Sequence, residues 1–189
     1  MYCLVNIALL FLCLLLPAIT TATERIPDQP RFKRLSAAAE QNISSILSIH
    51  KDRFGFMWFG GKDGLARFDG YEFSIYRTQP DNPDSLSNNV IWDIAEAPNG
   101  DLWLATEKGL NQFIRDTQVF VKHPSPSSWT DAKRRDRILT LFRDKHTLLL
   151  GSDGGLSAFD LNTQTFTSYP RHNQEQGLAG EYVLSLIHI

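Results

Sequence analysis

Residues 58–68 read Trp58-Phe59-Gly60-Gly61-Lys62-Asp63-Gly64-Leu65-Ala66-Arg67-Phe68. The pattern returns as Trp103-Leu104-Ala105-Thr106-Glu107-Lys108-Gly109-Leu110-Asn111-Gln112-Phe113, and again as Leu149-Leu150-Gly151-Ser152-Asp153-Gly154-Gly155-Leu156-Ser157-Ala158-Phe159. The glycines give the period, since 45 residues separate Gly64 from Gly109 and 46 separate Gly109 from Gly155. A fixed step of this length indicates a protein made of repeats.

Each repeat divides into four short apolar segments separated by turns. In the first repeat the segments are Ile46 to Ile49, Met57 to Gly60, Leu65 to Phe68 and Glu72 to Tyr76. The turns at 52–55, 62–64, 98–101 and 107–109 each contain a glycine that supplies positive φ. The pattern predicts four antiparallel strands per repeat, which is the composition of a propeller blade.

The predicted fold is all-β, an incomplete β-propeller with four-stranded blades. The blades are expected at about 43–78, 88–123 and 136–169, followed by the start of a fourth at 178–189. A sheet this small must bury both faces, so we expect the recurring Trp, Leu and Phe side chains to pack between blades. Propellers close with roughly four to eight blades, and we therefore expect this one to continue beyond the present sequence.

The third repeat departs from the first two at two places. Lys145-His146-Thr147 lacks the glycine of the first turn. Leu149 stands where the earlier repeats have Trp58 and Trp103. We expect the third blade to form with a tighter or distorted first turn.

The N-terminal residues form a unit of their own. The segment from Leu4 to Leu16 is almost entirely apolar and small residues follow it, so residues 1–22 are predicted to be a secretory signal peptide cleaved after Ala22. Its apolar core of about 13 residues is shorter than the roughly 20 of a membrane-spanning helix. No Lys or Arg precedes the core, so an uncleaved anchor stays open as the alternative. Residues 23–42 are assigned as a lead-in to the propeller.

Cysteine usage indicates the cellular location of the protein, and its net charge indicates which kinds of partner are disfavoured. Cys3 and Cys13 both lie inside the signal, so the mature chain has no cysteine. An exported domain without disulfides fits a bacterial periplasm better than a eukaryotic secretory route. The net charge of -2 favours neither nucleic acid nor an anionic membrane surface as a partner. The predicted location is therefore the periplasm.

No group of residues in the sequence forms a recognisable active site. The five histidines lack the spacing of a metal site, and none lies beside a nucleophile motif; they are His50, His123, His146, His172 and His188. The sequence therefore predicts no catalytic residue, no metal site and no cofactor, and it leaves the ligand-binding residues unknown.

Several side chains have both a structural and a functional interpretation. Trp58 and Trp103 are expected to pack between blades, with stacking on sugar rings as the alternative. The acidic residues of the turns are expected to cap those turns, with calcium binding as the alternative; they are Asp52, Asp63, Asp101 and Asp153. The basic run at 133–137 is interpreted as a solvated loop. Asn42 lies in a glycosylation pattern and is expected to be unmodified in a periplasm.

The repeats resemble those of the two-component regulator propeller family. Blades of that family carry Asp-x-x-Gly, an apolar-Trp strand, a Gly-Thr-like pair, and Gly-Leu followed by an aromatic residue. Residues 52–69 match nearly every position and residues 99–113 match most, while 85–90 resemble the connector between blades. The resemblance covers about residues 32–186.

The resemblance implies the extracytoplasmic sensor domain of a membrane-bound bacterial signalling protein. In such proteins the output is commonly a histidine kinase, often a hybrid one, and in some relatives a diguanylate cyclase, with the parent protein anchored in the inner membrane by a helix downstream of the propeller. The implied partners are a small-molecule or glycan ligand and a second copy in a homodimer. A secreted propeller lyase of the streptogramin-lyase kind, or a binding protein, is the rival interpretation.

Overall fold

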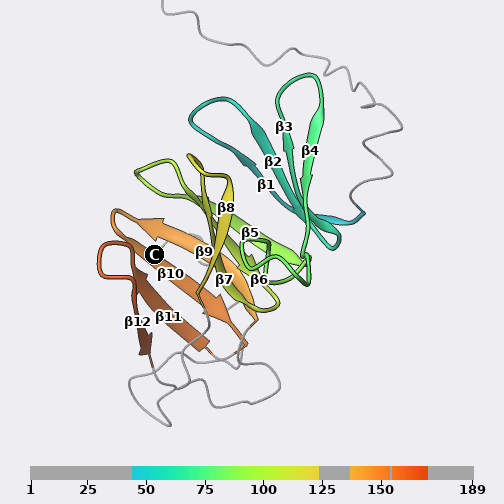
Figure 1. Ribbon diagram of the computed structural model, residues 1–189. Helices are drawn as coiled ribbons and strands as arrows, with labels where there is room; N and C mark the ends of the chain where they lie inside the picture. The colour runs from blue at the N-terminus through green and yellow to red at the C-terminus, as the bar shows by residue number, and fades with distance from the viewer. Residues whose placement is uncertain (1–43, 124–136, 154, 170–189) are drawn as a thin grey trace, which may run out of the picture. The chain divides into compact units, whose positions relative to one another are not determined.

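Antiparallel sheets of four strands make up the described part of the chain (Figure 1). The structure is a computed structural model, and it describes residues 44–123, 137–153 and 155–169. The first sheet contains β1 (Ile46–Lys51), β2 (Met57–Gly61), β3 (Gly64–Phe68) and β4 (Phe73–Tyr76). The second contains β5 (Ile91–Glu96), β6 (Leu102–Thr106), β7 (Gly109–Ile114) and β8 (Val119–His123). The third contains β9 (Ile138–Asp144), β10 (Thr147–Ser152), β11 (Gly155–Asp160) and β12 (Thr165–Tyr169).

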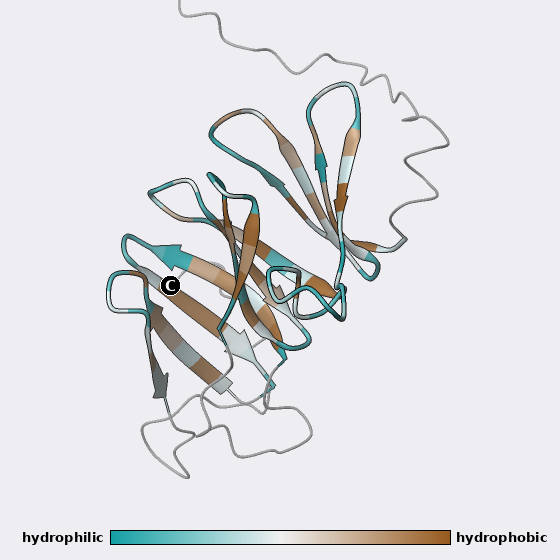
Figure 2. Cartoon of the chain, in the orientation of Figure 1, coloured by the Kyte–Doolittle hydropathy of each residue, from teal (hydrophilic) through white to brown (hydrophobic). Residues whose placement is uncertain are grey.

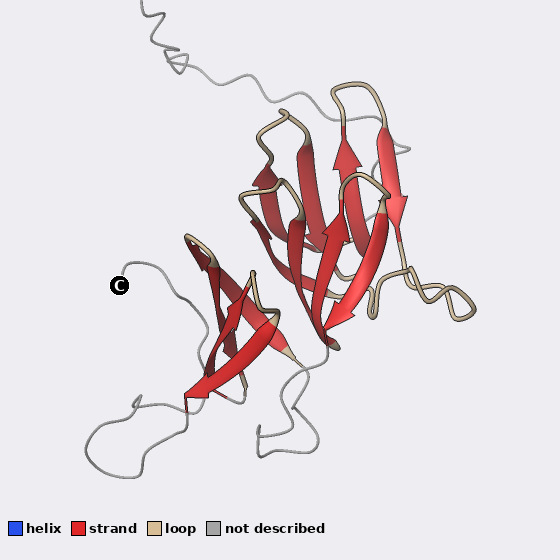
Figure 3. Cartoon of the chain, turned by 60° about the vertical axis from the view of Figure 1, so that its left-hand side comes forward, coloured by secondary structure: helices blue, strands red, loops and turns tan. Residues whose placement is uncertain are grey.

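In every sheet, strands that follow one another in the chain pair side by side. Figure 3 shows strands and loops throughout the described ranges. The all-β fold with four-stranded propeller blades, predicted from the repeat, is therefore confirmed. The predicted signal peptide, the lead-in at 23–42 and the start of a fourth blade at 178–189 lie outside the described residues.

The first turn of each sheet follows the presence or absence of glycine. Gly55 and Gly100 have φ of 91° and 94°, in the left-handed region that favours glycine, and each lies in a connection that runs from the first strand to the second. In the third sheet only Lys145 and His146 separate β9 from β10, and Lys145 itself has a φ of 51°. The tighter first turn predicted for the third blade is therefore confirmed.

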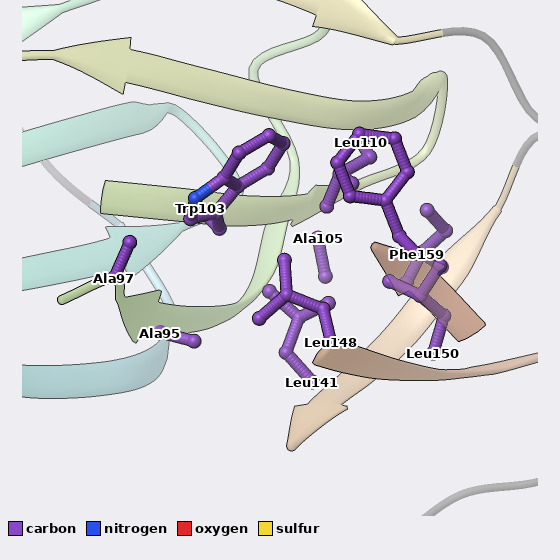
Figure 4. Packing of buried hydrophobic residues seen from close by; sticks show 10 residues of the cluster. Ala95, Ala97, Trp103, Ala105, Leu110, Leu141, Leu148, Leu150 and Phe159 are labelled. Carbon is purple, nitrogen blue, oxygen red and sulfur yellow. The ribbon is translucent and has the colours of Figure 1, made fainter. Parts of the chain in front are cut away.

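Neighbouring sheets pack against each other through two clusters of buried side chains. The first junction, between the first and second sheets, contains Trp58, Leu65, Leu86, Ile91, Ile94, Leu102, Leu104, Phe113 and Phe120. The second junction, between the second and third sheets, contains Ala95, Ala97, Trp103, Ala105, Leu110, Ile138, Leu141, Leu148, Leu150 and Phe159 (Figure 4). The side chains of Trp58 and Trp103 are 0% and 2% exposed, which confirms that they pack between blades.

Alternation along β6 explains why the second sheet is buried on both faces. Successive side chains of a strand point to opposite faces of the sheet. Leu102 and Leu104 accordingly belong to the first junction, whereas Trp103 and Ala105 belong to the second. Figure 2 shows the hydrophobic colouring concentrated on strands and the hydrophilic colouring on turns. The buried faces therefore come from strand alternation, as a propeller requires.

Leu149, which replaces the tryptophan of the earlier repeats, contributes to neither junction. It is half-buried, while its neighbours Leu148 and Leu150 are buried in the second junction. By strand alternation its side chain points to the face of the third sheet that lies away from the second. The loss of tryptophan in the third repeat therefore leaves both junctions of the described residues intact.

Asp93 in β5 connects the first strands of all three sheets through its carboxylate. Ser48 Oγ in β1 donates to Asp93 Oδ1 at 3.3 Å. From β9, Leu141 N and Thr140 Oγ1 donate to Asp93 Oδ2 at 2.8 and 3.2 Å. Strands β1 and β9 are far apart in the sequence, yet one side chain holds both to β5. A polar link of this kind fixes the relative position of the sheets in addition to apolar packing, which is non-directional.

Gly60 in β2 lies where only a hydrogen atom fits between the first and second sheets. A Cβ atom at this position would lie 2.7 Å from Ile91 Cγ2 and 3.3 Å from the Ile91 carbonyl oxygen. We expect Gly60→Ala to lower the free energy of unfolding by about 1–3 kcal/mol, because the sheets must separate to relieve the clash. Chemical denaturation of the variant and the parent measures this difference, and equal stability would contradict the packing described here.

Candidate functional site

At the first junction, a buried carboxylate is hydrogen-bonded to a tryptophan and an arginine. Asp52 begins the turn after β1, and its side chain is 0% exposed. Trp58 Nε1 and Arg115 Nη2 both donate to Asp52 Oδ2 at 2.8 Å. The backbone N–H groups of Phe54 and Phe56 both donate to Oδ1 at 2.9 Å. The carboxylate thus caps its own turn and also bridges the first sheet to the second.

The charge of Asp52 is stabilised in place by these donors. Burial by itself raises the pKa of this carboxyl group, but the hydrogen bonds from Trp58, Arg115 and Phe56, together with the positive charge of Arg115, lower its pKa below the ordinary value. Arg115 follows β7, and its guanidinium also donates to the Gly100 carbonyl oxygen at 2.9 Å. The ion pair between Asp52 and Arg115 is therefore supported by further hydrogen bonds on both partners.

The second junction has different residues at the same repeat positions. Ala97 replaces Asp52, and Leu161, which follows β11 as Arg115 follows β7, replaces the arginine. Trp103 is retained in the place of Trp58. Among the described residues, the buried Nε1 of Trp103 has no hydrogen-bond partner. The second junction thus keeps the donor but has neither the acceptor nor the cation.

A cavity of about 250 Å³ lies at this place in the second junction. The second sheet and its turns line it with Ala97, Pro98, Asn99, Trp103 and Gln112. The third sheet and its turns line it with His146, Leu161, Asn162 and Gln164. Figure 4 shows Trp103 with its indole nitrogen on the side of Ala97, away from Phe159. The cavity is our candidate ligand site, because it is a concave space between two sheets that both polar and apolar side chains line.

Each of the two tryptophans packs against two other aromatic rings. Ring centroids of Tyr76 and Phe113 lie 6.0 and 5.3 Å from that of Trp58. Those of His123 and Phe159 lie 5.1 and 5.0 Å from that of Trp103. Because the two side chains are 0% and 2% exposed, a sugar ring has no free indole face to stack on.

His123 packs against the Trp103 ring, and its burial lowers its pKa. Because the pKa is lowered in the folded protein, the unfolded chain binds a proton more readily than the folded one. The stability that the neutral ring contributes is therefore present above the ordinary pKa of about 6.5, and it is lost as the pH falls below that value. We expect the free energy of unfolding to fall between about pH 7.5 and 5.5, and His123→Gln to remove part of that fall. Denaturation at the two pH values measures it.

The matched control is His146→Gln, because His146 is exposed at the rim of the cavity. This control is expected to keep the pH dependence that belongs to His123. A pH dependence in His123→Gln as steep as in the parent would contradict the assignment.

The other acidic turn residues are bound within the protein. Asp63 accepts hydrogen bonds from the backbone N–H and hydroxyl of Ser44. Asp101 accepts from Arg115 N at 3.0 Å and from Gln112 Nε2 at 2.9 Å. Asp153 pairs with Arg137, whose Nε lies 2.8 Å from Asp153 Oδ2. Each carboxylate is engaged by protein donors, as expected for residues that organise turns and junctions.

Arg137 is the last residue of the predicted basic run and the one residue of that run that the structure describes. Residues 133–136 lie outside the described residues, as do Asn42, His172 and His188. Within the described ranges, no group of three or more His, Cys, Asp or Glu side chains gathers in a way that would hold a metal ion. The same ranges contain no helix that is long and apolar enough to cross a membrane.

A further cavity of about 200 Å³ lies beside the connector between the first and second sheets. Polar groups in its wall bind one another. Gln79 N donates to Ser85 Oγ at 3.0 Å, Ser85 Oγ donates to the Asn82 carbonyl oxygen at 2.8 Å, and Asn82 Nδ2 donates to Gln79 Oε1 at 3.0 Å. These groups stabilise the connector, so the cavity at the second junction is the stronger candidate for binding.

Sequence reasoning did not identify the cavity, although the repeat contains a signal for it. Aligning the repeats places Ala97 opposite Asp52 and Leu161 opposite Arg115. Small or apolar residues at two positions that are charged in the neighbouring repeat indicate a lost contact. The alignment alone does not show that these two positions, 64 residues apart, meet beside Trp103.

Comparisons with known proteins agree with the repeat and the fold. Residues 85–108, which include β5 and β6, match the family model described as two component regulator propeller. A protein of Formosa agariphila named histidine kinase P4 is 39% identical over 56 residues, which are 30% of this chain and 4% of that protein. The present chain therefore spans a small part of the length of this relative.

Solved structures give the same result over more of the chain. The extracellular domain of the hybrid two component system BT4673 of B. thetaiotaomicron is 27% identical with a TM-score of 0.57, over 73% of this chain and 20% of that one. A second structure, of the extracellular domain of BT4673 described as a one component system, is 17% identical with a TM-score of 0.57, over 74% and 18% of the two chains, and it supports the fold alone. The described part of the chain therefore has the fold of a partial propeller, and residues 85–108 within it match the two-component regulator propeller model.

Proposed function

We propose that this chain is the ligand-sensing, extracytoplasmic part of a membrane-bound bacterial signal-transduction protein whose output is a hybrid histidine kinase. The observation that carries the proposal is the likeness to an extracellular domain of a hybrid two component system, at 27% identity and a TM-score of 0.57. The 39% identity to a protein named histidine kinase P4 favours a kinase over a diguanylate cyclase or a propeller lyase.

The junctions between sheets provide the physical basis for sensing. A ligand changes the signalling state only if it binds one arrangement of the protein more tightly than the other. A molecule bound between two sheets contacts both, so its binding energy depends directly on how the sheets are placed. The proposed parent protein acts as a homodimer, is anchored in the inner membrane downstream of the propeller, and responds to a small-molecule or glycan ligand in the periplasm.

The location is tested by fusing alkaline phosphatase after residue 169 in a bacterial host, because this enzyme is active only after export. We expect an active fusion. The matched control deletes residues 1–22, the predicted signal peptide, and is expected to be inactive. Equal activity of the two fusions, or inactivity of both with the protein present in the cytoplasm, would contradict the extracytoplasmic location.

The sensing role is tested in the complete gene. Reading the frame downstream of residue 186 separates the classes of protein: further blades, a membrane span and a kinase support the sensor, whereas a frame that ends after the propeller, with no span, points to a secreted lyase or binding protein. In a host that carries the kinase and a transcriptional reporter, deletion of the propeller is expected to abolish the response to extracellular nutrients. An unchanged response would contradict the proposal.

A further inference from the structure

Short polar contacts join the first and second sheets at the end of their junction that lies beside the first turn of each sheet, called here the first-turn end. Asp52 Oδ2 accepts from Arg115 Nη2 at 2.8 Å. The guanidinium of Arg53 donates to Glu96 Oε1 at 2.6 Å and to two carbonyl oxygens of the turn that follows β5 at 2.6 and 2.7 Å. Hydrogen bonds are lost within a few tenths of an ångström, so these contacts oppose even a small separation of the two sheets.

Among the described residues, the second junction lacks the counterparts of these contacts. By the repeat, the places of Asp52, Arg53, Glu96 and Arg115 are taken by Ala97, Pro98, Arg143 and Leu161. Arg143 is exposed and donates to the Lys145 carbonyl oxygen of its own turn at 3.3 Å. The first-turn end of this junction instead borders the cavity of about 250 Å³, whose lining contains no Lys, Arg, Asp or Glu. The described residues that line the cavity therefore form no ion pair between the second and third sheets.

Polar contacts between the second and third sheets lie elsewhere along the junction. Asp93 Oδ2, within β5, accepts from Leu141 N at 2.8 Å and from Thr140 Oγ1 at 3.2 Å. Arg137, directly before β9, has its Nη1 3.8 Å from Oε1 of Glu107 in the turn between β6 and β7. The cavity, by contrast, is lined mainly by the turns that follow β5, β9 and β11. The two sheets are thus held together along their first strands and at the opposite end, and a cavity separates them at the first-turn end.

Opening the first-turn end costs less at the second junction than at the first for two further reasons. Side chains that border a cavity have fewer van der Waals contacts to lose when the sheets separate. Trp103 Nε1 is buried without a hydrogen-bond partner among the described residues, so water that enters on opening satisfies this donor. Trp58 Nε1 already donates to Asp52 at 2.8 Å, and opening the first junction only exchanges one acceptor for another.

We propose that the second junction is a hinge, at which the third sheet pivots on the second about the Asp93 contacts and opens at the cavity, while the first and second sheets move as one unit. An opening of this kind gives the propeller two arrangements that a bound molecule can distinguish. The inference goes beyond the proposed sensing function, because it concerns the movement of the sheets and holds whatever the output of the parent protein is.

The test is native-state labelling of introduced thiols in the full-length protein. Leu102 and Leu148 form a matched pair, because they occupy the same repeat position, are both 0% exposed and belong to the first and the second junction respectively. Alkylation of Leu102→Cys and of Leu148→Cys by iodoacetamide is followed by mass spectrometry of the peptide that contains each thiol. We expect Leu148→Cys to react at least about tenfold faster, with a rate that depends less steeply on urea than global unfolding does.

Exchanging side chains between the junctions connects the labelling rate to the contacts described. Ala97→Asp with Leu161→Arg places the acid and the base of the first junction at the second, so it is expected to slow labelling of Leu148→Cys and to leave that of Leu102→Cys unchanged. If this variant does not fold, Ala97→Leu fills part of the cavity with an apolar side chain and is expected to slow the same reaction.

The reverse exchange, Asp52→Ala with Arg115→Leu, removes the acid and the base of the first junction and is expected to speed labelling of Leu102→Cys. Three results would overturn the inference: equal rates for the two thiols, labelling of both only through global unfolding, or labelling of Leu148→Cys that a folded cavity-filling variant does not slow. These results concern purified protein, so the export and reporter tests of the sensing function neither support nor contradict the hinge.

Discussion

Replacing Asp52 with alanine is expected to lower the free energy of unfolding by about 3–5 kcal/mol, the usual cost of removing one partner from a buried ion pair. The carboxylate accepts hydrogen bonds from Trp58 Nε1, Arg115 Nη2 and two backbone N–H groups, and its side chain is 0% exposed. The substitution leaves all four donors without this acceptor, and Arg115, only 18% exposed, keeps its charge. Equilibrium denaturation in urea at pH 7 measures the loss.

Two further variants show whether the stranded charge causes the loss. Asp52→Ala with Arg115→Leu is expected to recover part of the stability, because it removes the unpaired guanidinium and reproduces a combination that the second junction already contains. Asp116→Ala is the matched control, since Asp116 lies beside Arg115 in the sequence but is exposed. A loss below about 1 kcal/mol in Asp52→Ala, or an equal loss in the control, would show that the ion pair does not stabilise the junction.

The Asp52 contribution also predicts a pH dependence. Its pKa in the folded protein is lowered, so the stability it provides is complete above the ordinary value of about 3.9 and is lost as pH falls below that value toward the folded pKa. Asp52→Asn is therefore expected to flatten the fall in stability at acid pH relative to the parent.

Trp58→Ala is expected to lower the free energy of unfolding by a similar amount, about 3–5 kcal/mol, because it empties the centre of the first junction. The side chain is 0% exposed and packs against Tyr76 and Phe113. Removing it also leaves Asp52 with one donor fewer. Since the two residues share a hydrogen bond, the losses in Asp52→Ala and Trp58→Ala should not add in the double variant.

Tyr71→Ala is the matched control for this prediction. Tyr71 is an aromatic residue of the same sheet, in the turn before β4, and it is 96% exposed. Its removal is expected to change stability by no more than about 0.5 kcal/mol. A small effect of Trp58→Ala, within the same limit, would mean that the first and second sheets do not pack as described.

The repeat predicted the blades well because strand alternation and turn chemistry are local. Trp58 and Trp103 were expected between blades, and both are buried there. The missing glycine before Thr147 predicted a tighter turn, and the connection from β9 to β10 is shortened to two residues. Each of these features depends on residues that are close in the sequence, where backbone conformation and side-chain direction follow simple rules.

Neither the ion pair at the first junction nor the cavity at the second was predicted, because the parts of each come from distant segments. The Asp52 and Arg115 side chains, 63 residues apart, meet only when the second sheet packs on the first. Asp52 was expected to cap a turn, and it does so through two backbone N–H groups, but its contacts to Trp58 and Arg115 carry the junction. A carboxylate that only caps its own turn and one that also bridges two sheets have the same local sequence, so the sequence does not distinguish them.

The sequence by itself determined that this protein consists of four-stranded blades with a period of 45 to 46 residues, because periodicity and turn residues act within each repeat. Only the tertiary structure decided which junction is filled and which holds a cavity. Asp52 and Arg115 form an ion pair at the first, whereas Ala97 and Leu161 line a cavity at the second, where the buried Trp103 nitrogen has no hydrogen-bond partner among the described residues. The physical reason is that such a contact forms between sheets, where charge pairing and volume depend on two repeats at once.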